Sequence, residues 1–378
     1  MITTPAHRPT TGVRQLALLA AVQVCAMSLW FSASAVVPAL RVEWGLSREL
    51  AILLTVTVQA GFAAGAVCSA ALTLADRFPP HQLIAGSSLL AATATGLLPW
   101  CPHGLAGPLR FLTGFALAGV YPVGMKVVVS WFPRKRGLAL GVLLGALTVG
   151  SALPNLLTPL PWRAVLLSSA LLAVLGAALA AAFVEAAPAE ASPWHPRYLL
   201  EMAKDRRQRR VCLGYFGHMW ELYAFWAWLP AYLAATGGPR GPAAFVVTGL
   251  CGLAGCLLGG ALSDRCGRAV VAVAAMLTSA GCALVSFLAA GTGWLLPVLV
   301  VWGVAVIADS GQFSAALAET ADPRYVGTAL TAMTALGFLL SAGTIQLLPL
   351  AADALGWRAA VPLLAIGPLL GALAMRRR

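Results

Sequence analysis

Four ionisable residues lie within long apolar stretches of the sequence: Lys126, His218, Glu221 and Asp309. Taking a charged group out of water costs several kcal/mol, so such residues persist where they pair, line a hydrated cavity or carry out chemistry. A carboxylate or an imidazole can take up and release a proton, and an ammonium group can contact an anion. We therefore predict that Glu221, Asp309 and His218 couple protons to another process and that Lys126 binds an anion.

Helical spacing places polar and aromatic residues beside these groups. Asp309 and Gln312 are three residues apart, so they share one face of a helix. Gln23 and Trp30 are seven apart and share a face in the same way. The residues that we expect to contact a bound solute are Lys126, Gln312, Gln23, Trp30, Tyr121, Trp220 and Tyr223.

Each ionisable residue also has a purely structural interpretation. Glu221 could instead form a buried pair with Lys126 that holds two parts of the chain together. His218 could donate to a backbone carbonyl, and Asp309 could cap a helix break near Gly311. The aromatic residues around Glu221 could equally form packed core or a belt at the membrane interface.

The composition indicates which elements must position these residues. Hydrophobic residues make up 60% of the 378-residue chain and charged residues 10%, whereas a soluble domain has about 25% charged residues. This excludes a soluble enzyme, and the continuous apolar runs lack the alternation of barrel strands. Since a span needs about 20 apolar residues, the sequence predicts an all-α integral membrane protein with twelve transmembrane helices. The expected spans are residues 16–40, 48–74, 82–100, 108–131, 137–160, 163–184, 211–235, 243–262, 269–290, 293–319, 327–350 and 357–375.

The basic residues indicate how the spans are oriented. The 25 Lys and Arg residues divide 18 to 6 between the two sets of loops, and Lys126 lies inside a span. Positively charged loops favour the cytoplasm, so we expect both termini there, in a bacterial-type inner (plasma) membrane. The same bias accounts for the net charge of +12 without nucleic-acid binding. The eight cysteines are scattered without a CxxC pair, and we expect neither a metal site nor a cofactor.

Sequence repeats divide the chain into two similar halves. Three short motifs recur in register: Pro-Arg-x-x-Gly-x-Ala-Leu at 133 and 323, Asp-Arg at 76 and 264, and Trp-Arg at 162 and 357. The widest gap between spans is rich in Pro, Glu and Arg. We predict an N-terminal six-helix bundle over 1–184, a cytoplasmic linker over 185–210 and a C-terminal six-helix bundle over 211–378.

The loops after spans 2 and 8 resemble the signature loop of the major facilitator superfamily, Gly-x-Leu-x-Asp-Arg-x-Gly-Arg. The second copy, Gly-Ala-Leu-Ser-Asp-Arg-Cys-Gly-Arg over 260–268, matches it closely. The first copy, over 72–80, keeps the Leu and the Asp-Arg but loses both glycines and the final Arg. The resemblance implies two six-helix bundles around a central cavity that is lined by spans 1, 4, 7 and 10.

A second element of the resemblance lies in span 4. Arg110 followed by Thr113-Gly114 is similar to the family's Arg-x-x-x-Gly element. Arg110 lies 16 residues before Lys126, about 160° around an ideal helix. We therefore expect the two side chains on different faces, unless Pro122 bends the span.

The signature loop has a physical role. A carboxylate there can accept hydrogen bonds from the N-terminus of a facing helix, and arginines can bridge to carbonyls or carboxylates. We expect such a cluster to latch the two bundles together at the cytoplasmic end and to break when that end opens. The gating residues would be Asp76, Arg77, Asp264, Arg265 and Arg268.

These observations predict a secondary active transporter that moves a small polar, anionic organic solute by alternating access, coupled to protons. One alternative is an exporter of amphipathic compounds by proton antiport, and another is a non-transporting membrane sensor or scaffold on the same fold. The sequence has no HExxH, GxSxG or phosphate-binding motif, so we do not expect an enzyme. The expected partners are the solute, protons and the lipid bilayer, and we expect a monomer.

Overall fold

The computed structural model describes residues 9–132, 135–185, 198–238 and 242–376, and within these ranges the secondary structure is entirely helical. The helices of the first half are α1 (Pro9–Met27), α2 (Ser32–Ala35), α3 (Val37–Trp44), α4 (Arg48–Ala71), α5 (Leu74–Arg77), α6 (Pro80–Leu97), α7 (Ala106–Leu117), α8 (Tyr121–Trp131), α9 (Arg136–Ala152), α10 (Pro154–Leu157) and α11 (Trp162–Phe183). Those that follow are α12 (Tyr198–Lys204), α13 (Arg206–Ala235), α14 (Ala243–Phe245), α15 (Cys251–Cys266), α16 (Arg268–Ala289), α17 (Leu295–Ala308), α18 (Ser310–Thr320), α19 (Val326–Leu355), α20 (Trp357–Ala360) and α21 (Ile366–Arg376). The expectation of an all-α protein is confirmed.

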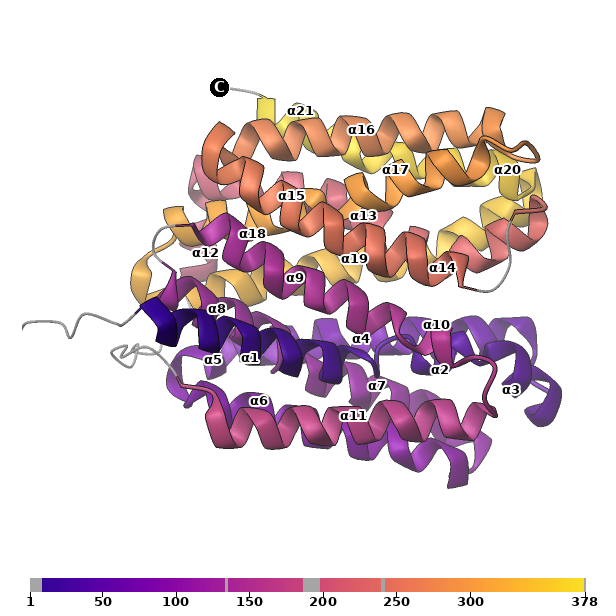
Figure 1. The fold of residues 1–378 in the computed structure, drawn as a ribbon, viewed down its shortest axis with the longest axis horizontal. Coiled ribbons are helices and arrows are strands. Elements are labelled where there is room, and N and C mark those ends of the chain that lie inside the picture. The colour runs from indigo at the N-terminus through magenta and orange to yellow at the C-terminus, as the bar shows by residue number, and fades with distance from the viewer. Residues whose placement is uncertain (1–8, 133–134, 186–197, 239–241, 377–378) are drawn as a thin grey trace, which may run out of the picture.

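The long helices run side by side, with the earlier half of the chain in the lower part of Figure 1 and the later half in the upper part. Across the boundary, α4 packs on α19 and α9 packs on α15. The chain enters α1 and leaves α21 at the left of the view, which we call the α5 end, and the opposite end is the α3 end. Of the predicted linker, residues 186–197 lie outside the described residues.

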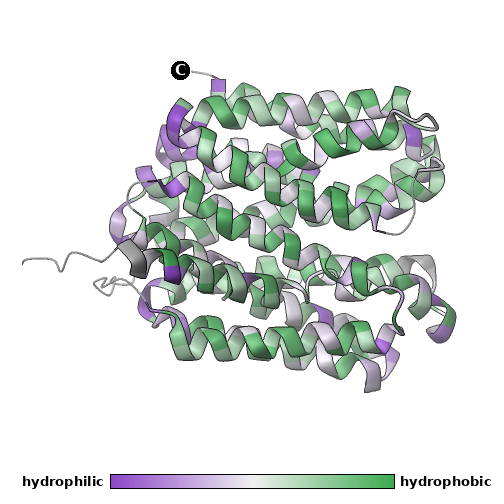
Figure 2. Cartoon of the chain, viewed as in Figure 1, coloured by the Kyte–Doolittle hydropathy of each residue, from purple (hydrophilic) through white to green (hydrophobic). Residues whose placement is uncertain are grey.

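The apolar surface of the helices fits a membrane. Ten of the described helical segments are long and apolar enough to cross one by length and composition. The two other expected spans lie in α1–α3, which is broken, and in α13, where His218, Glu221 and several aromatic residues lower the hydropathy. Hydrophilic residues gather mainly at the ends of the helices (Figure 2). The chain is therefore a multi-pass integral membrane protein.

Three of the expected spans are interrupted in the middle. Span 1 breaks between Met27 and Ser32, span 4 between Leu117 and Tyr121, and span 10 at Asp309. In span 4 the new helix begins with Pro122 in its first turn, as expected for a residue without an amide N–H. Such breaks free backbone carbonyls inside a membrane, so each must find another donor.

Glycines allow the closest helix contacts. A Cβ on Gly61 or Gly65 of α4 would overlap the backbone of α7 at Phe111 or Phe115. A Cβ on Gly114 of α7 would likewise overlap the backbone of α4. α4 and α7 are thus pressed together with backbone against backbone, which fixes the register of the two helices.

We expect Gly61→Ala to destabilise the protein by about 1–3 kcal/mol, because the added methyl group overpacks the contact with α7. Gly281→Ala in α16 is the matched control, since nothing lies within 4 Å of a Cβ there. Thermal unfolding in detergent would measure both variants. Equal melting temperatures for the two would contradict the close contact.

A cluster of charged and aromatic side chains joins α3 to α11 at the α3 end. The Glu43 carboxylate accepts hydrogen bonds from the Trp162 indole and from the Arg163 guanidinium. Trp44 stacks on His103 with ring centroids 4.6 Å apart and meets Trp162 edge-on at 5.4 Å. The Trp162 hydrogen bond, followed by the Arg163 guanidinium, lowers the pKa of Glu43 below its usual range.

This lowered pKa predicts a pH-dependent stability. A carboxyl group with a folded-state pKa below the unfolded value stabilises the fold above the unfolded pKa and loses that effect as the pH falls through the folded pKa. We expect the melting temperature of the wild type to exceed that of Glu43→Gln at neutral pH, and the difference to shrink on acidification. A difference that stays constant from pH 7 to strongly acidic conditions would show that Glu43 titrates normally.

Candidate functional site

Aromatic rings from both halves meet at the centre of the molecule. Trp30, from the break in span 1, lies 5.0 Å from Phe62 of α4, 5.6 Å from Tyr223 of α13 and 5.1 Å from Phe338 of α19, measured between ring centroids. Phe62 and Phe338 are 4.2 Å apart. We call Trp30, Phe62, Tyr223 and Phe338 the aromatic cluster. All four side chains are buried, so the rings pack against one another away from solvent.

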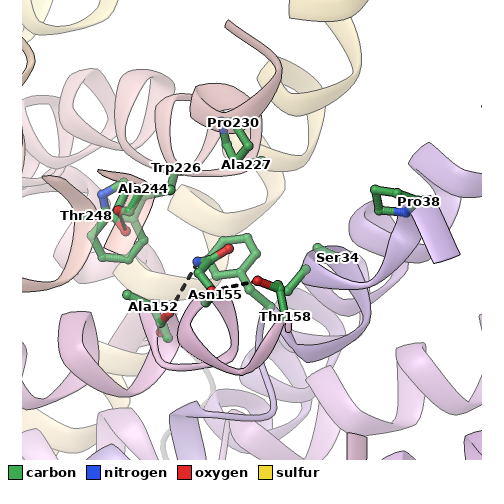
Figure 3. A pocket seen from close by; sticks show the side chains of 13 residues that line it. Ser34, Pro38, Ala152, Asn155, Thr158, Trp226, Ala227, Pro230, Ala244 and Thr248 are labelled. Carbon is green, nitrogen blue, oxygen red and sulfur yellow. Dashed lines mark hydrogen bonds between the residues drawn. The ribbon is translucent and has the colours of Figure 1, made fainter. Parts of the chain in front are cut away.

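A cavity of about 250 Å³ opens between the halves on the α3-end side of this cluster. Its polar lining consists of hydroxyl and amide side chains and includes no charged residue (Figure 3). Phe31 and Trp226 line it and also contact Tyr223 of the aromatic cluster, with ring centroids 6.4 and 5.6 Å away, so these two residues lie between the cavity and the cluster. The lining residues are Phe31, Ser34, Ala35, Pro38, Ser151, Ala152, Asn155, Thr158, Trp226, Ala227, Pro230, Ala244 and Thr248.

Several buried polar groups of spans 1, 2, 7 and 10 have unused hydrogen-bonding atoms. In the part of the chain that the structure describes, no partner is found for Gln23 Nε2, Trp30 Nε1, both amide atoms of Gln59, Trp226 Nε1 and Gln312 Oε1. Each such group costs about 1–3 kcal/mol when it stays unsatisfied. Their concentration in these spans suits a polar solute that satisfies them when it binds.

Arg110 is the most deeply buried cation among the described residues. Its guanidinium is 0% exposed and donates to the carbonyls of Leu29 and Trp30, at 3.1 and 2.5 Å. Both carbonyls lie at the break in span 1. The Leu29 carbonyl also accepts from the Ser32 amide and hydroxyl, at 3.4 and 2.8 Å, so Arg110 is an added donor there. Its Nε has no partner within the described residues. Arg110 therefore reaches the centre of the molecule from a different face than Lys126.

His218 and Asp309 form a buried pair between α13 and the break in span 10. His218 Nδ1 lies 2.8 Å from Asp309 Oδ1, and the side chains are 1% and 3% exposed. Asp309 precedes α18 but its side chain makes no cap hydrogen bond, so the capping interpretation is wrong. His218 Nε2 has no partner among the described residues. The two side chains therefore pair with each other away from solvent.

Glu221 points into the later half of the chain. Its carboxylate accepts from Ser279 of α16 at 2.8 Å and from the Trp302 indole of α17 at 2.7 Å. The residue is 1% exposed. Lys126 is bound elsewhere, so the alternative of a Glu221–Lys126 pair is wrong. His218 contacts Asp309 and not Glu221, which separates the two acids into different environments.

Asp76 of α5 caps the N-terminus of α19 in the other half. Its Oδ2 accepts from the Thr328 amide at 3.0 Å and from the Thr328 hydroxyl at 2.8 Å. Lys126 Nζ lies 2.6 Å from Asp76 Oδ1 and donates to the Ala75 carbonyl at 2.8 Å. A Cβ on Gly327 would come within 2.5 Å of Asp76, so a glycine is needed there. We call this arrangement the first latch.

Asp264 caps the N-terminus of α9 in the reciprocal way. Its two oxygens accept from the amides of Gly137 and Leu138, at 3.2 and 3.0 Å. Arg268 bridges Asp264 at 2.7 Å to Glu319 of α18 at 3.1 Å. The glycine of the recurring Pro-Arg-x-x-Gly motif thus marks the helix start that each aspartate caps. We call this arrangement the second latch, and both latches join the two halves at the α5 end.

The other predicted residues occupy different surroundings. Arg77 and Arg265 are exposed, and no ion pair is found for either among the described residues. Tyr121 is buried at the start of α8 against Ser310 and Ser314 of α18. Trp220 lies away from the aromatic cluster, where its indole donates to the Leu363 carbonyl at 3.4 Å. Trp220 therefore does not line the cavity.

Sequence reasoning missed several of these contacts. Ser279 and Trp302 hold Glu221, and Thr328 holds Asp76, but single hydroxyl or indole groups in apolar spans give no periodic signal. Thr328 could have been found, because it follows the glycine of the second Pro-Arg-x-x-Gly motif. Gln59 could also have been singled out, since it is a polar residue in the middle of an apolar span.

Known proteins resemble this chain in sequence and in fold. The family model of the Major Facilitator Superfamily matches residues 19–344. The chain is 31% identical over 109 residues to "Probable anion transporter 2, chloroplastic" of Oryza sativa subsp. japonica, a match over 27% of this chain and 20% of that protein. The E. coli fucose:proton symporter FucP superposes with a TM-score of 0.72 and 16% identity, over 97% of this chain and 98% of that one. The human organic anion transporter MFSD10 (TETRAN) gives 0.71 and 16%, over 98% of this chain and all (100%) of that one.

Proposed function

Because the chain belongs to the major facilitator superfamily and is a secondary transporter of a small solute, we propose that its cargo is a polar organic anion and that protons drive it. The observation that carries this proposal is the set of unpaired polar atoms on Gln23, Trp30, Gln59, Trp226 and Gln312. They come from both halves of the chain, so a solute that bound them would join the halves. The proposal of an anion is supported by the names of two relatives, a probable anion transporter and an organic anion transporter.

The two latches and the cavity support transport by alternating access. Both latches join the halves at the α5 end, whereas the cavity lies between them at the α3 end. With the α5 end placed in the cytoplasm, as the basic residues favour, this conformation is closed inward and accessible from outside. Opening inward would break the contacts of Asp76 and Asp264 and close the cavity.

Proton coupling is assigned to the His218–Asp309 pair, with Glu221 as a second proton site. The pair lies at the break in span 10, where a change in charge can alter how α17 and α18 meet. Lys126 is held by Asp76 in this conformation, so it could meet an anion only after the first latch opens. We place the protein in a bacterial-type inner (plasma) membrane with both termini in the cytoplasm.

The test is uptake by proteoliposomes under an imposed pH gradient. The probes are radiolabelled gluconate, succinate and benzenesulfonate, with sorbitol and tetramethylammonium as neutral and cationic comparisons and protein-free vesicles as the baseline. We expect at least one anion to accumulate and the accumulation to collapse with a protonophore. Accumulation of only sorbitol or tetramethylammonium, or accumulation that survives the protonophore, would contradict the proposal.

A further inference from the structure

An apolar groove of about 450 Å³ lies on the surface of the later half, where α15, α16 and α17 run side by side (Figure 1). Among its lining residues Leu258, Leu262 and Val270 are exposed, whereas Gly259 and Ala275 are buried. Small buried residues between larger exposed ones form a furrow along the helices. Because the chain is a multi-pass membrane protein, this furrow faces the acyl chains of the bilayer.

The lining of the groove favours a hydrocarbon occupant. Apart from Cys266 and Thr278, the lining residues are all Ala, Gly, Leu or Val. The Thr278 hydroxyl already donates to the Ala274 carbonyl at 2.9 Å. A hydrocarbon chain gives up no hydrogen bond when it enters such surroundings, whereas a polar solute does.

The length of the groove matches one leaflet of the membrane. On α15 it extends from Cys266, at the α5 end, back to Leu258, and on α16 from Val270 to Thr278. Either stretch covers about 12 Å at a rise of 1.5 Å per residue. One leaflet contributes about 15 Å of hydrocarbon, half of a core that is about 30 Å thick. The groove can therefore hold an acyl chain of a lipid whose headgroup lies at the α5 end.

A cation lies at the headgroup end of the groove. Arg265 directly precedes Cys266 and comes three residues after Leu262, so it is next to the lining residues of α15. It is exposed, and the described part of the chain provides no ion pair for it. Arg268, by contrast, already bridges the acids of the second latch. Arg265 is thus the cation that remains to bind a phosphate group.

We propose that this groove is a binding site for an anionic phospholipid, with one acyl chain in the groove and the phosphate on Arg265. The apolar contacts retain the lipid, and the charge of Arg265 selects the headgroup. The site lies on the outer surface of the later half, away from the cavity between the halves. It is therefore independent of the cargo and of the coupling ion.

The test counts bound lipids by mass spectrometry of the intact full-length protein, released from detergent. The probes are dioleoyl-phosphatidylglycerol and dioleoyl-phosphatidylcholine, supplied in equal amounts. We expect the first lipid retained by the wild type to be phosphatidylglycerol, by about fivefold over phosphatidylcholine. Arg265→Gln should bring this preference to near one. The matched control Arg77→Gln, which changes an exposed arginine at the same end of the other half, should keep it.

A second pair of variants tests the groove itself. Ala274→Trp places a large side chain in the groove and should lower the retention of both lipids several-fold. Val285→Trp changes an exposed residue of the same helix beyond the groove and should retain both lipids like the wild type. All four substituted positions are exposed, so the variants are expected to fold.

The reactivity of Cys266 locates the lipid, because this exposed thiol lines the groove. In nanodiscs, phosphatidylglycerol should slow its modification by a maleimide relative to phosphatidylcholine alone, and Arg265→Gln should remove the difference. Soluble glycerol phosphate should not protect the thiol, since it has no chain to fill the groove.

Several results would overturn the proposal. One is a wild type without a headgroup preference, and another is a preference that survives in Arg265→Gln. An equal loss of preference in Arg77→Gln would indicate attraction to the whole basic surface instead of a site. Full lipid retention by Ala274→Trp, or equal protection of Cys266 by glycerol phosphate, would remove the groove from the site.

Discussion

Replacing Asp309 with Asn is expected to abolish solute accumulation driven by a pH gradient while solute exchange at equal pH continues. Asn keeps the size of the side chain but cannot carry a proton. The His218–Asp309 pair is buried to within a few per cent, so no water-exposed group can take over its role. Because accumulation needs the proton and exchange needs only the binding site, the two measurements separate coupling from folding.

Both measurements would use benzenesulfonate in proteoliposomes. The matched control is Asp205→Asn, which changes a carboxylate that caps its own helix, α13, through the amides of Arg207 and Gln208. We expect the control to accumulate the probe like the wild type, and Asp309→Asn to fall to the level of protein-free vesicles. Full accumulation by Asp309→Asn would remove the pair from the coupling mechanism.

The variant Glu221→Gln tests whether the second acid also takes part in proton coupling. We expect it to weaken accumulation as well, since Glu221 is a buried carboxylate without a cationic partner among the described residues. Unchanged accumulation would instead assign Glu221 to the packing of α13 against α16 and α17. Both hydrogen bonds of Glu221, from Ser279 and Trp302, lie within the later half of the chain, so the substitution leaves the contacts between the halves in place.

Removing both latch carboxylates, in Asp76→Ala/Asp264→Ala, should open the α5 end. Each carboxylate makes hydrogen bonds that join the two halves, and hydrogen bonds to charged groups contribute about 1.5–3 kcal/mol. The loss of each latch should therefore shift the ratio of closed to open molecules by about ten- to a hundredfold. The double variant should populate the inward-open form without solute.

Electron–electron distance measurements can detect this opening. Phe78 and Cys266 are exposed at the α5 end, one in each half, so Phe78→Cys in a background with Cys266 as the only other cysteine offers two labelling sites. We expect a longer distance in the double variant than in the parent protein. Asp205→Ala is again the control, because it removes a helix cap that does not join the halves. An unchanged distance in the double variant would mean that other contacts hold this end closed.

The aspartates of the two latches and the all-helical fold could be predicted from the sequence, because both follow from local patterns. Apolar runs of sufficient length must form helices in a membrane, and the repeated motif places a glycine where each aspartate meets a helix start. The partner of Lys126 could not be predicted in this way. Lys126 lies within span 4, but its long side chain extends toward the α5 end and reaches Asp76.

The centre of the molecule was harder to predict, because its geometry depends on residues far apart in the chain. The break in span 1 contains no proline or glycine, and two carbonyls there, those of Leu29 and Trp30, accept from Arg110, which is 80 residues away from Trp30. On an ideal helix, Arg110 and Lys126 lie on different faces, and in the structure they do contact different groups. A single ideal helix does not describe the whole of span 4, however, because the span breaks between α7 and α8.

The 2.6 Å separation of Lys126 and Asp76 also bears on how membrane voltage acts on the carrier. Voltage does work only on net charge that moves through the field, about 2.3 kcal/mol per elementary charge per 100 mV. Lys126 and Asp76 carry opposite charges and form a neutral pair while the first latch is closed. If one proton accompanies each monoanion, a transport cycle moves no net charge across the membrane. Uptake would then follow the proton concentration difference and be indifferent to the electrical potential.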